Sequence, residues 1–266
     1  MVVLDNYLLL DIPPFDIKYK RWKTYGYTCA EEKDNLRDTL NEATGGYCMY
    51  CYSRINVDNK WYGNMEHAIE KNNSYKLREC IPNIGAACMR CNQSLKRVGE
   101  KKRIISAKVI DVFESNSRCS WDKRKQCTVP CAALRNLQKK YSKMKDAEII
   151  LQPMGVKGED SNETFELRYN VFKMEFEPNT SLHSYSEKDI MFINRHIQRF
   201  KLNDPKYRTK ALIDYVKNVI DGNGKLPKYE FTNLIVQIFE DKLKDKTEAE
   251  RINICKKIYP IIFLNA

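Results

Sequence analysis

The 266-residue sequence has no long uninterrupted hydrophobic run. Its longest early apolar stretch, Val2 to Leu10, is broken by Asp5 and Asn6 and is too short to span a bilayer. The N-terminus also lacks the basic start and the small-residue cleavage site of a signal peptide. We therefore expect a cytoplasmic protein, whose ten cysteines are reduced thiols rather than disulfides.

Internal repeats and low-complexity linkers are absent as well. A hydrophobic share of 42%, with 16 tyrosines and 10 phenylalanines, excludes a disordered chain. The length is sufficient for a buried core and allows one large domain or two small ones.

The positive charge is concentrated in one segment. The whole chain carries a formal net charge of +11, whereas Met89 to Lys145 alone holds 16 Lys plus Arg and 4 Asp plus Glu, a balance of 16 − 4 = +12. Such a concentrated charge is typical of proteins that bind the phosphate backbone of nucleic acid. The alternative is a solvated basic face without a partner.

Hydrophobic periodicity predicts an α+β protein with a mostly helical C-terminal region. Residues 30–43 form a helix candidate, and Leu134, Leu137 and Tyr141 repeat at helical spacing. Alternating apolar residues from Phe165 to Phe176 predict a β-hairpin. Further helices are expected over 186–202, 206–220, 227–244 and 247–259.

Two C-x-x-C pairs provide the strongest motif. Cys48 and Cys51 form the first pair, and Cys88 and Cys91 form the second, 36 residues further on (52–87). Two residues between thiolates allow a tight knuckle whose sulfurs both face one ion, and two knuckles complete the tetrahedral set that structural Zn²⁺ prefers. We therefore expect one zinc site with a long insertion between its knuckles.

The run PNIGAACMRCNQSLK, which contains the second pair, resembles the zinc-ribbon HNH endonucleases. Asn83 lies five residues before Cys88, Lys96 lies four after Asn92, and a Glu66-His67 dipeptide stands upstream. The resemblance covers about 60 residues and includes the Gly-Gly-Tyr that leads into Cys48. It implies a ββα-metal (HNH) unit with a zinc ribbon over residues 45–105.

The resemblance also implies a role for each residue. His67 would be the general base, and Asn83 would orient the His67 imidazole or the loop that carries it. Glu66 and Asn92 would hold one Mg²⁺ or Mn²⁺, because hard oxygen ligands suit these ions, while zinc would be structural only. Glu66 and Asn92 replace the commoner aspartate and histidine, and Glu70 stands where many family members have proline.

Basic residues continue from the end of the motif. The candidates for contacts to the nucleic-acid backbone near the scissile phosphate are Lys96, Arg97, Lys101, Lys102 and Arg103. For each of them the alternative is a solvated helix end.

Three further cysteines lie inside the basic segment, at Cys119, Cys127 and Cys131. With Cys80 or His183 they could form a second zinc site, but their spacing matches no known pattern, and ordinary thiols are the favoured interpretation. His196 is interpreted as a residue at the boundary of the apolar face of its helix.

A wider resemblance links the chain to the retron-associated and Septu-type HNH nucleases of prokaryotic defence systems. It rests on the basic insert, the hairpin and a helix that ends at Leu202-Asn203, and it implies an ABC-type ATPase partner. The expected organisation is an N-terminal arm and helix (1–44), the HNH unit (45–105), a basic, partly helical insert (106–150) and a helical C-terminal region with the hairpin (151–266). DNA is the favoured substrate. The alternatives are an RNA- or tRNA-cleaving nuclease and a non-catalytic zinc-ribbon module that binds nucleic acid or a protein partner.

Overall fold

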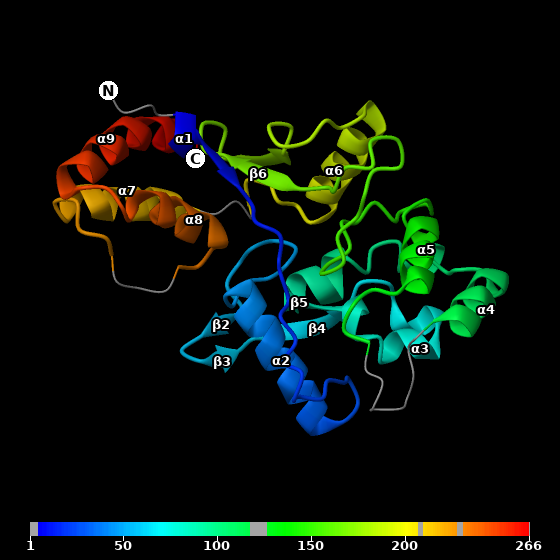
Figure 1. Ribbon diagram of the computed structural model, residues 1–266. Coiled ribbons are helices and arrows are strands. Elements are labelled where there is room, and N and C mark those ends of the chain that lie inside the picture. The colour runs from blue at the N-terminus through cyan, green and yellow to red at the C-terminus, as the bar shows by residue number, and fades with distance from the viewer. Residues whose placement is uncertain (1–4, 118–126, 207–209, 228–230, 266) are drawn as a thin grey trace.

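The computed structural model of the chain describes residues 5–117, 127–206, 210–227 and 231–265 (Figure 1). It is a mixed α/β structure with small antiparallel sheets. In chain order the elements are α1 (Asp5–Leu8), β1 (Leu9–Asp11), α2 (Ala30–Thr44), β2 (Asn56–Val57), β3 (Lys60–Trp61), β4 (Gly63–His67), η1 (Lys71–Asn73), α3 (Tyr75–Arg78), η2 (Ile81–Asn83), β5 (Ile84–Cys88), η3 (Arg90–Leu95), η4 (Glu100–Lys102), α4 (Ala107–Asn116), α5 (Ala132–Tyr141), β6 (Leu167–Asn170), β7 (Glu175–Pro178), α6 (Glu187–Arg199), α7 (Ala211–Asp221), α8 (Leu234–Leu243) and α9 (Glu248–Leu264).

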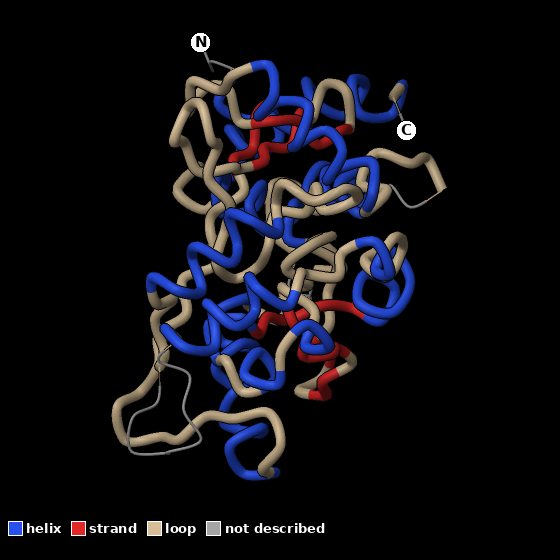
Figure 2. The backbone as a smooth tube through the Cα atoms, turned by 90° about the vertical axis from the view of Figure 1, so that its right-hand side faces the viewer, coloured by secondary structure: helices blue, strands red, loops and turns tan. Residues whose placement is uncertain are grey.

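The elements gather in two regions, which Figures 1 and 2 show in two orthogonal views. One region holds α2, the short strands β2 to β5 and the helices α3 to α5. The other holds α1, the sheet β1-β6-β7 and the helices α6 to α9. Buried hydrophobic residues of both regions belong to one continuous cluster.

The predicted hairpin is confirmed as β6 and β7, which pair antiparallel with Tyr169 opposite Phe176. Beside β6 lies β1 from the N-terminal arm, with Leu10 opposite Tyr169. All three of these side chains are buried, so the sheet has one face in the core. The pairing of β1 with β6 joins the N-terminal arm to a segment about 160 residues further along the chain.

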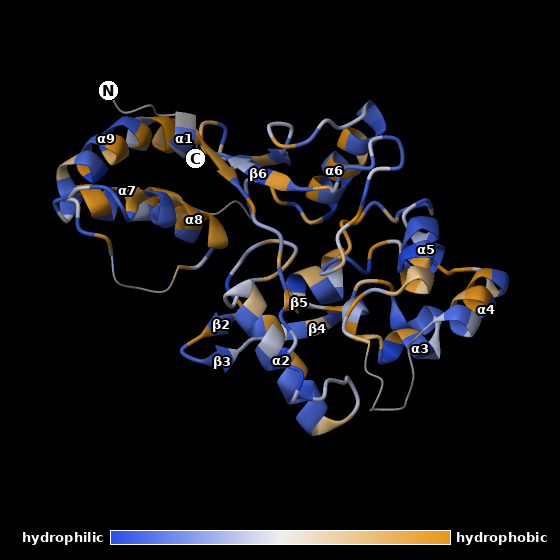
Figure 3. Cartoon of the chain, in the orientation of Figure 1, coloured by the Kyte–Doolittle hydropathy of each residue, from blue (hydrophilic) through white to orange (hydrophobic). Residues whose placement is uncertain are grey.

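Within the described residues the helix predictions are confirmed in position, with shifted ends; the first residues of the predicted helices 206–220 and 227–244 include 207–209 and 228–230, which lie outside the described residues. Helix α2 covers the predicted 30–43, and α6 begins with a capping box in which Ser186 and Asp189 satisfy each other's backbone N–H groups. The last helix, α9, does not end at residue 259 but continues through Pro260 to Leu264. In Figure 3 the helices α7, α8 and α9 lie together and carry many hydrophobic residues. Val219 of α7 and Ile258 of α9 are fully buried.

The structure corrects the interpretation of His196 as a boundary residue. Its side chain is buried, and its Nδ1 accepts a hydrogen bond from the Ile150 backbone N–H at 3.0 Å. Burial lowers the pKa of His196 to about 3, so the ring stays neutral at physiological pH. The residue is part of the core and ties α6 to the segment that precedes β6.

The pair β4 and β5 carries several of the predicted site residues. The strands run antiparallel, with Glu66 opposite Gly85 and His67 opposite Ile84, and η3 follows β5 after one residue. The position opposite Glu66 is tightly packed, because a Cβ at Gly85 would lie 3.0 Å from both the Gln152 carbonyl oxygen and the Met49 sulfur. Within the described residues, the helices are too short or too polar to cross a membrane.

Candidate functional site

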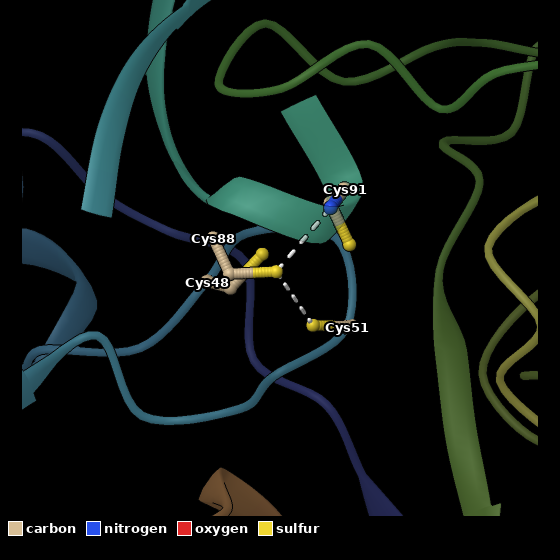
Figure 4. A group of neighbouring side chains, drawn as sticks. All are labelled: Cys48, Cys51, Cys88 and Cys91. Carbon is tan, nitrogen blue, oxygen red and sulfur yellow. Dashed lines mark hydrogen bonds between the residues drawn. The ribbon is translucent and has the colours of Figure 1, made fainter. Parts of the chain in front are cut away.

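The four cysteines of the two C-x-x-C pairs converge, as the sequence predicts. Their sulfur atoms all lie within 4.8 Å of one another, and Cys51 Sγ is 3.6 Å from Cys88 Sγ (Figure 4). Ligands of a tetrahedral Zn²⁺ at Zn–S distances of about 2.3 Å are about 3.8 Å apart. The cluster therefore fits a structural zinc ion, and three of its four residues are buried.

Each pair forms a knuckle stabilised by its own backbone. In the first, the Tyr52 N–H donates to the Cys48 carbonyl at 2.9 Å, and Tyr52 adopts a left-handed conformation with φ 62°. In the second, the Cys91 N–H donates to Cys88 Sγ at 3.4 Å. Hydrogen bonds from the Cys48 and Cys88 thiols lower the pKa of Cys51, whereas burial raises the pKa of Cys48.

Beside this cluster lies a cavity of about 180 Å³. It brings together the three residues to which the resemblance assigns the base and the metal ligands. Its lining consists of Tyr27, Met65, Glu66, His67, Glu70, Lys71, Asn72, Asn92, Lys96, Arg97, Glu100 and Arg103. Glu66 and His67 come from the end of β4, and Asn92 comes from η3, immediately after the second knuckle.

Glu66 is almost completely buried and both of its carboxylate oxygens are paired. The side chain is 2% exposed. The Tyr50 hydroxyl donates to Oε2 at 2.6 Å, and the Lys96 ammonium forms an ion pair with Oε1. Tyr50 lies between the two cysteines of the first knuckle, so the zinc cluster and the carboxylate share a supporting residue.

His67 is held on two sides. Its Nε2 lies 3.0 Å from the Arg78 carbonyl oxygen, and its ring packs edge-on against Tyr27 with the centroids 4.5 Å apart. Because a carbonyl can only accept, Nε2 carries the proton and Nδ1 keeps its lone pair. Burial lowers the pKa of His67 to about 4, and the charge of Lys71 acts in the same direction. The imidazole is therefore neutral at physiological pH.

Asn83 holds the loop that follows His67. Its Oδ1 accepts from the Ile69 N–H at 2.8 Å, and its Nδ2 donates to the Ile69 carbonyl at 2.9 Å. The Ala68 N–H also donates to the Asn83 backbone carbonyl at 2.7 Å. Of the two roles that the sequence leaves open, these bonds support the loop rather than the imidazole.

The five predicted nucleic-acid contacts do not form one surface. Arg97 and Lys101 are exposed, and Lys102 is exposed but paired with Asp146 at 3.1 Å. Lys96 and Arg103 are only 4% and 1% exposed. Neither of these two side chains lies on an exposed surface, because Lys96 is paired with Glu66 and Arg103 with Glu70.

Arg103 is the centre of a buried polar network at the cavity. It donates to Glu70 Oε1 at 2.8 Å, to the Tyr141 hydroxyl at 2.8 Å and to the Lys96 carbonyl at 2.6 Å. Tyr141 also donates to Glu70 Oε1 at 2.8 Å. Glu70 therefore links the loop after β4 to Arg103 through an ion pair and to the end of α5 through the Tyr141 hydroxyl.

The proposed second cysteine group is only partly visible. Cys119 lies outside the described residues. The Cys127 thiol donates to the Val129 carbonyl at 2.9 Å, and His183 is paired with Glu163 at 2.8 Å. Among the residues that the structure describes, the four-cysteine cluster is the one group of three or more Cys, His, Asp or Glu side chains whose ligand atoms converge.

Two residues of the site were missed by the sequence reasoning. Tyr50 is one of the two unspecified residues of the first C-x-x-C pair, and Tyr27 lies in the N-terminal arm, outside the motif. Their contacts span 16 residues to Glu66 and 40 residues (67 − 27) to His67, so no local pattern marks them.

Comparison with protein-family models, with curated proteins and with solved structures finds no match to this chain. The function is therefore argued from the geometry of the site and from the sequence motif.

Proposed function

We propose that the protein is a metal-dependent HNH endonuclease that hydrolyses phosphodiester bonds in nucleic acid. The observation that carries this proposal is that Glu66, His67 and Asn92 line one cavity. These residues are separated by up to 26 positions (92 − 66) in the sequence, and a neutral imidazole beside two hard oxygen ligands is a set that suits metal-assisted hydrolysis.

The local architecture supports the same interpretation. An antiparallel strand pair, β4 and β5, is followed by the short helix η3, and the second zinc knuckle lies between β5 and η3. This order agrees with a ββα-metal unit in which a structural zinc ion fixes the start of the helix. The four cysteines then have a structural role, and chemistry takes place in the adjacent cavity.

His67 is the residue that would accept the proton of the attacking water. Its protonated Nε2 is fixed on the Arg78 carbonyl, which leaves the Nδ1 lone pair as the basic position. Asn83 contributes by holding the backbone that follows His67. Both interactions restrict the imidazole before substrate binds, which reduces the reorganisation needed during the reaction.

The donor set fits a divalent ion of the Mg²⁺ or Mn²⁺ type. Glu66 offers a carboxylate and Asn92 an amide oxygen in the same cavity, and these two residues would hold it. When bound, such an ion polarises the phosphate and stabilises the leaving oxygen.

DNA is the favoured substrate, and a role as the effector subunit of a prokaryotic defence complex with an ABC-type ATPase is part of the proposal. The partner and the defence role rest on the sequence resemblance alone. The basic segment supports a polyanionic substrate, but phosphate contacts do not distinguish DNA from RNA.

Incubation of the purified protein with plasmid DNA and, separately, with total tRNA tests the proposal. We expect cleavage in Mg²⁺ or Mn²⁺ and none in EDTA. Addition of the candidate ATPase partner forms a second arm, because control by the partner would keep the isolated chain inactive. Cleavage of tRNA but not plasmid would establish the RNA-cleaving alternative.

One observation favours a non-catalytic zinc-ribbon module. The buried Glu66 carboxylate is saturated by Tyr50 and Lys96, which is how a purely structural ion pair is built. A module of this kind would bind nucleic acid or its partner protein. It would show no ion-dependent cleavage of plasmid DNA or tRNA, with or without the ATPase partner.

The exposed basic residues are expected to contribute to substrate binding without taking part in chemistry. Arg97→Glu with Lys101→Glu should weaken nucleic-acid affinity in 0.1 M salt by at least about tenfold and reduce the slope of log K against log salt by about two. Arg103 is unsuitable for this test because its reversal would disrupt the core. Fluorescence anisotropy with a labelled duplex at several salt concentrations measures both quantities. An unchanged slope would mean that this face is merely solvated.

A further inference from the structure

Lys96 and Glu66 form a buried ion pair at the point where the proposed function needs a divalent cation. Their side chains are 5% and 2% exposed. Besides the Glu66 carboxylate, the Lys96 ammonium also donates to the His67 backbone carbonyl. A positive charge is therefore already bound between the proposed metal ligand and the strand that carries the proposed base.

The two partners of Glu66 differ in their freedom to move. Tyr50 is fully buried, and its ring stacks on Phe200 at the C-cap of α6 with the centroids 4.7 Å apart and an interplanar angle of 15°. The Lys96 ammonium stands at the end of a flexible four-carbon side chain, and Lys96 lines the cavity. Tyr50 is thus a fixed support of the carboxylate, and Lys96 is the partner that can be exchanged.

An ammonium group and a divalent ion cannot both contact the same buried carboxylate oxygen at low cost, because like charges repel strongly in a site that is screened from water. We propose that Lys96 is a resident counter-ion of Glu66, so that a divalent ion binds only by displacing the Lys96 ammonium. This inference rests on the proposed function and adds a means of regulation to the same site.

The displaced ammonium would need a new anionic partner. The cavity that Lys96 lines is the place where a substrate phosphate would lie in the proposed reaction. Substrate binding therefore favours release of Lys96 and tightens ion binding, and by reciprocity the ion favours substrate binding. Without nucleic acid, the Lys96 ammonium competes with the divalent ion for the Glu66 carboxylate, so the affinity of the site for the ion is low.

The test is a titration of the purified full chain with Mn²⁺ in the absence of nucleic acid, followed by calorimetry or by the EPR signal of free Mn²⁺. The zinc cluster stays loaded throughout, because four thiolates prefer zinc to manganese. We expect Lys96→Met to bind Mn²⁺ at least about tenfold more tightly than the parent, since the competing charge is gone. Glu66→Gln should lose the binding.

Lys71→Met is the matched control. Lys71 has the same charge and lines the same cavity, but its ammonium contacts the Tyr27 hydroxyl at 3.3 Å. Loss of its charge should change Mn²⁺ affinity much less. An equal gain in Lys71→Met would mean that general electrostatics, and not displacement from Glu66, controls the ion, and would overturn the inference.

Two further outcomes separate this inference from the proposed function. If the parent protein binds Mn²⁺ and Lys96→Met binds it with the same affinity, the counter-ion role is overturned and the nuclease proposal stands. Absence of Mn²⁺ binding in the parent and in every variant overturns both. Should Lys96→Met fail to fold around the uncompensated Glu66 charge, Lys96→Gln keeps a hydrogen-bond donor for the carboxylate without the positive charge, and the same affinity gain is expected.

Discussion

His67→Asn is expected to reduce nucleic-acid cleavage by about 10²–10⁴-fold, the usual cost of losing a general base. Asparagine keeps a planar polar group at the level of Nδ1 but has no basic nitrogen, and the Arg78 carbonyl loses the donor that His67 Nε2 supplies in the parent protein. It is preferable to alanine, because His67 is only 7% exposed and packs against Tyr27, so that truncation would leave a cavity.

The measurement is the initial rate of cleavage under the conditions that support activity in the parent. His183→Asn is the matched control, since it makes the same substitution at a histidine that is paired with Glu163 and Glu166 in the C-terminal region. It should cleave at the parental rate. Zinc content and far-UV circular dichroism should be the same in all three proteins.

The metal dependence of the variants distinguishes a base from a ligand. Asn92→Ala should lose activity largely through ion affinity, so high Mn²⁺ should restore part of it. His67→Asn should gain nothing from added Mn²⁺, because an ion cannot replace the proton acceptor. If His67→Asn cleaved as fast as the parent protein, the nuclease assignment would be wrong, and the non-catalytic zinc-ribbon module would be the better interpretation.

The parts of the structure that could be predicted are those that local sequence patterns determine. Paired cysteines at C-x-x-C spacing specify their own knuckle geometry, and the apolar stripe of α6, with Ser186 at its N-cap, specifies a helix without reference to the rest of the chain. The hairpin β6–β7 follows from alternation for the same reason.

The parts that could not be predicted depend on contacts between distant segments. The burial of Lys96 and Arg103 is invisible in a run of basic residues, because their partners Glu66 and Glu70 lie 30 and 33 positions away. The pairing of β1 with β6 likewise joins residues about 160 positions apart. Helix α9 continues past its predicted end because burial of Ile262 on the following turn favours a helix despite Pro260.

Tyr50 connects a local sequence pattern, the first C-x-x-C pair, with contacts between distant segments of the chain. It lies within the first knuckle, yet its hydroxyl donates to Glu66 and its ring stacks on Phe200 at the C-cap of α6. The geometry of the candidate site therefore depends on the four-cysteine cluster, even though the cysteines themselves take no part in the proposed chemistry.

From this dependence we expect removal of one zinc ligand to have the largest structural effect in the chain. The purified protein should contain about one zinc per chain, and Cys88→Ser should lose it, since structural zinc contributes about 10–16 kcal/mol in zinc-finger peptides. Hydrogen exchange should accelerate in both knuckles, in β5 and in η3, while the sheet β1-β6-β7 remains protected.

Cys29→Ser is the control, because Cys29 is exposed and lies outside the cluster. It should keep both the zinc and the exchange pattern of the parent protein. Elemental analysis measures the zinc content, and hydrogen exchange followed by mass spectrometry measures the exchange pattern. Cys88→Ser should also lose cleavage with no rescue by Mn²⁺, because the first knuckle no longer positions Tyr50 against Glu66. A folded parent protein that contains no zinc, or a Cys88→Ser variant that retains it, would show that the four thiols do not form a metal site.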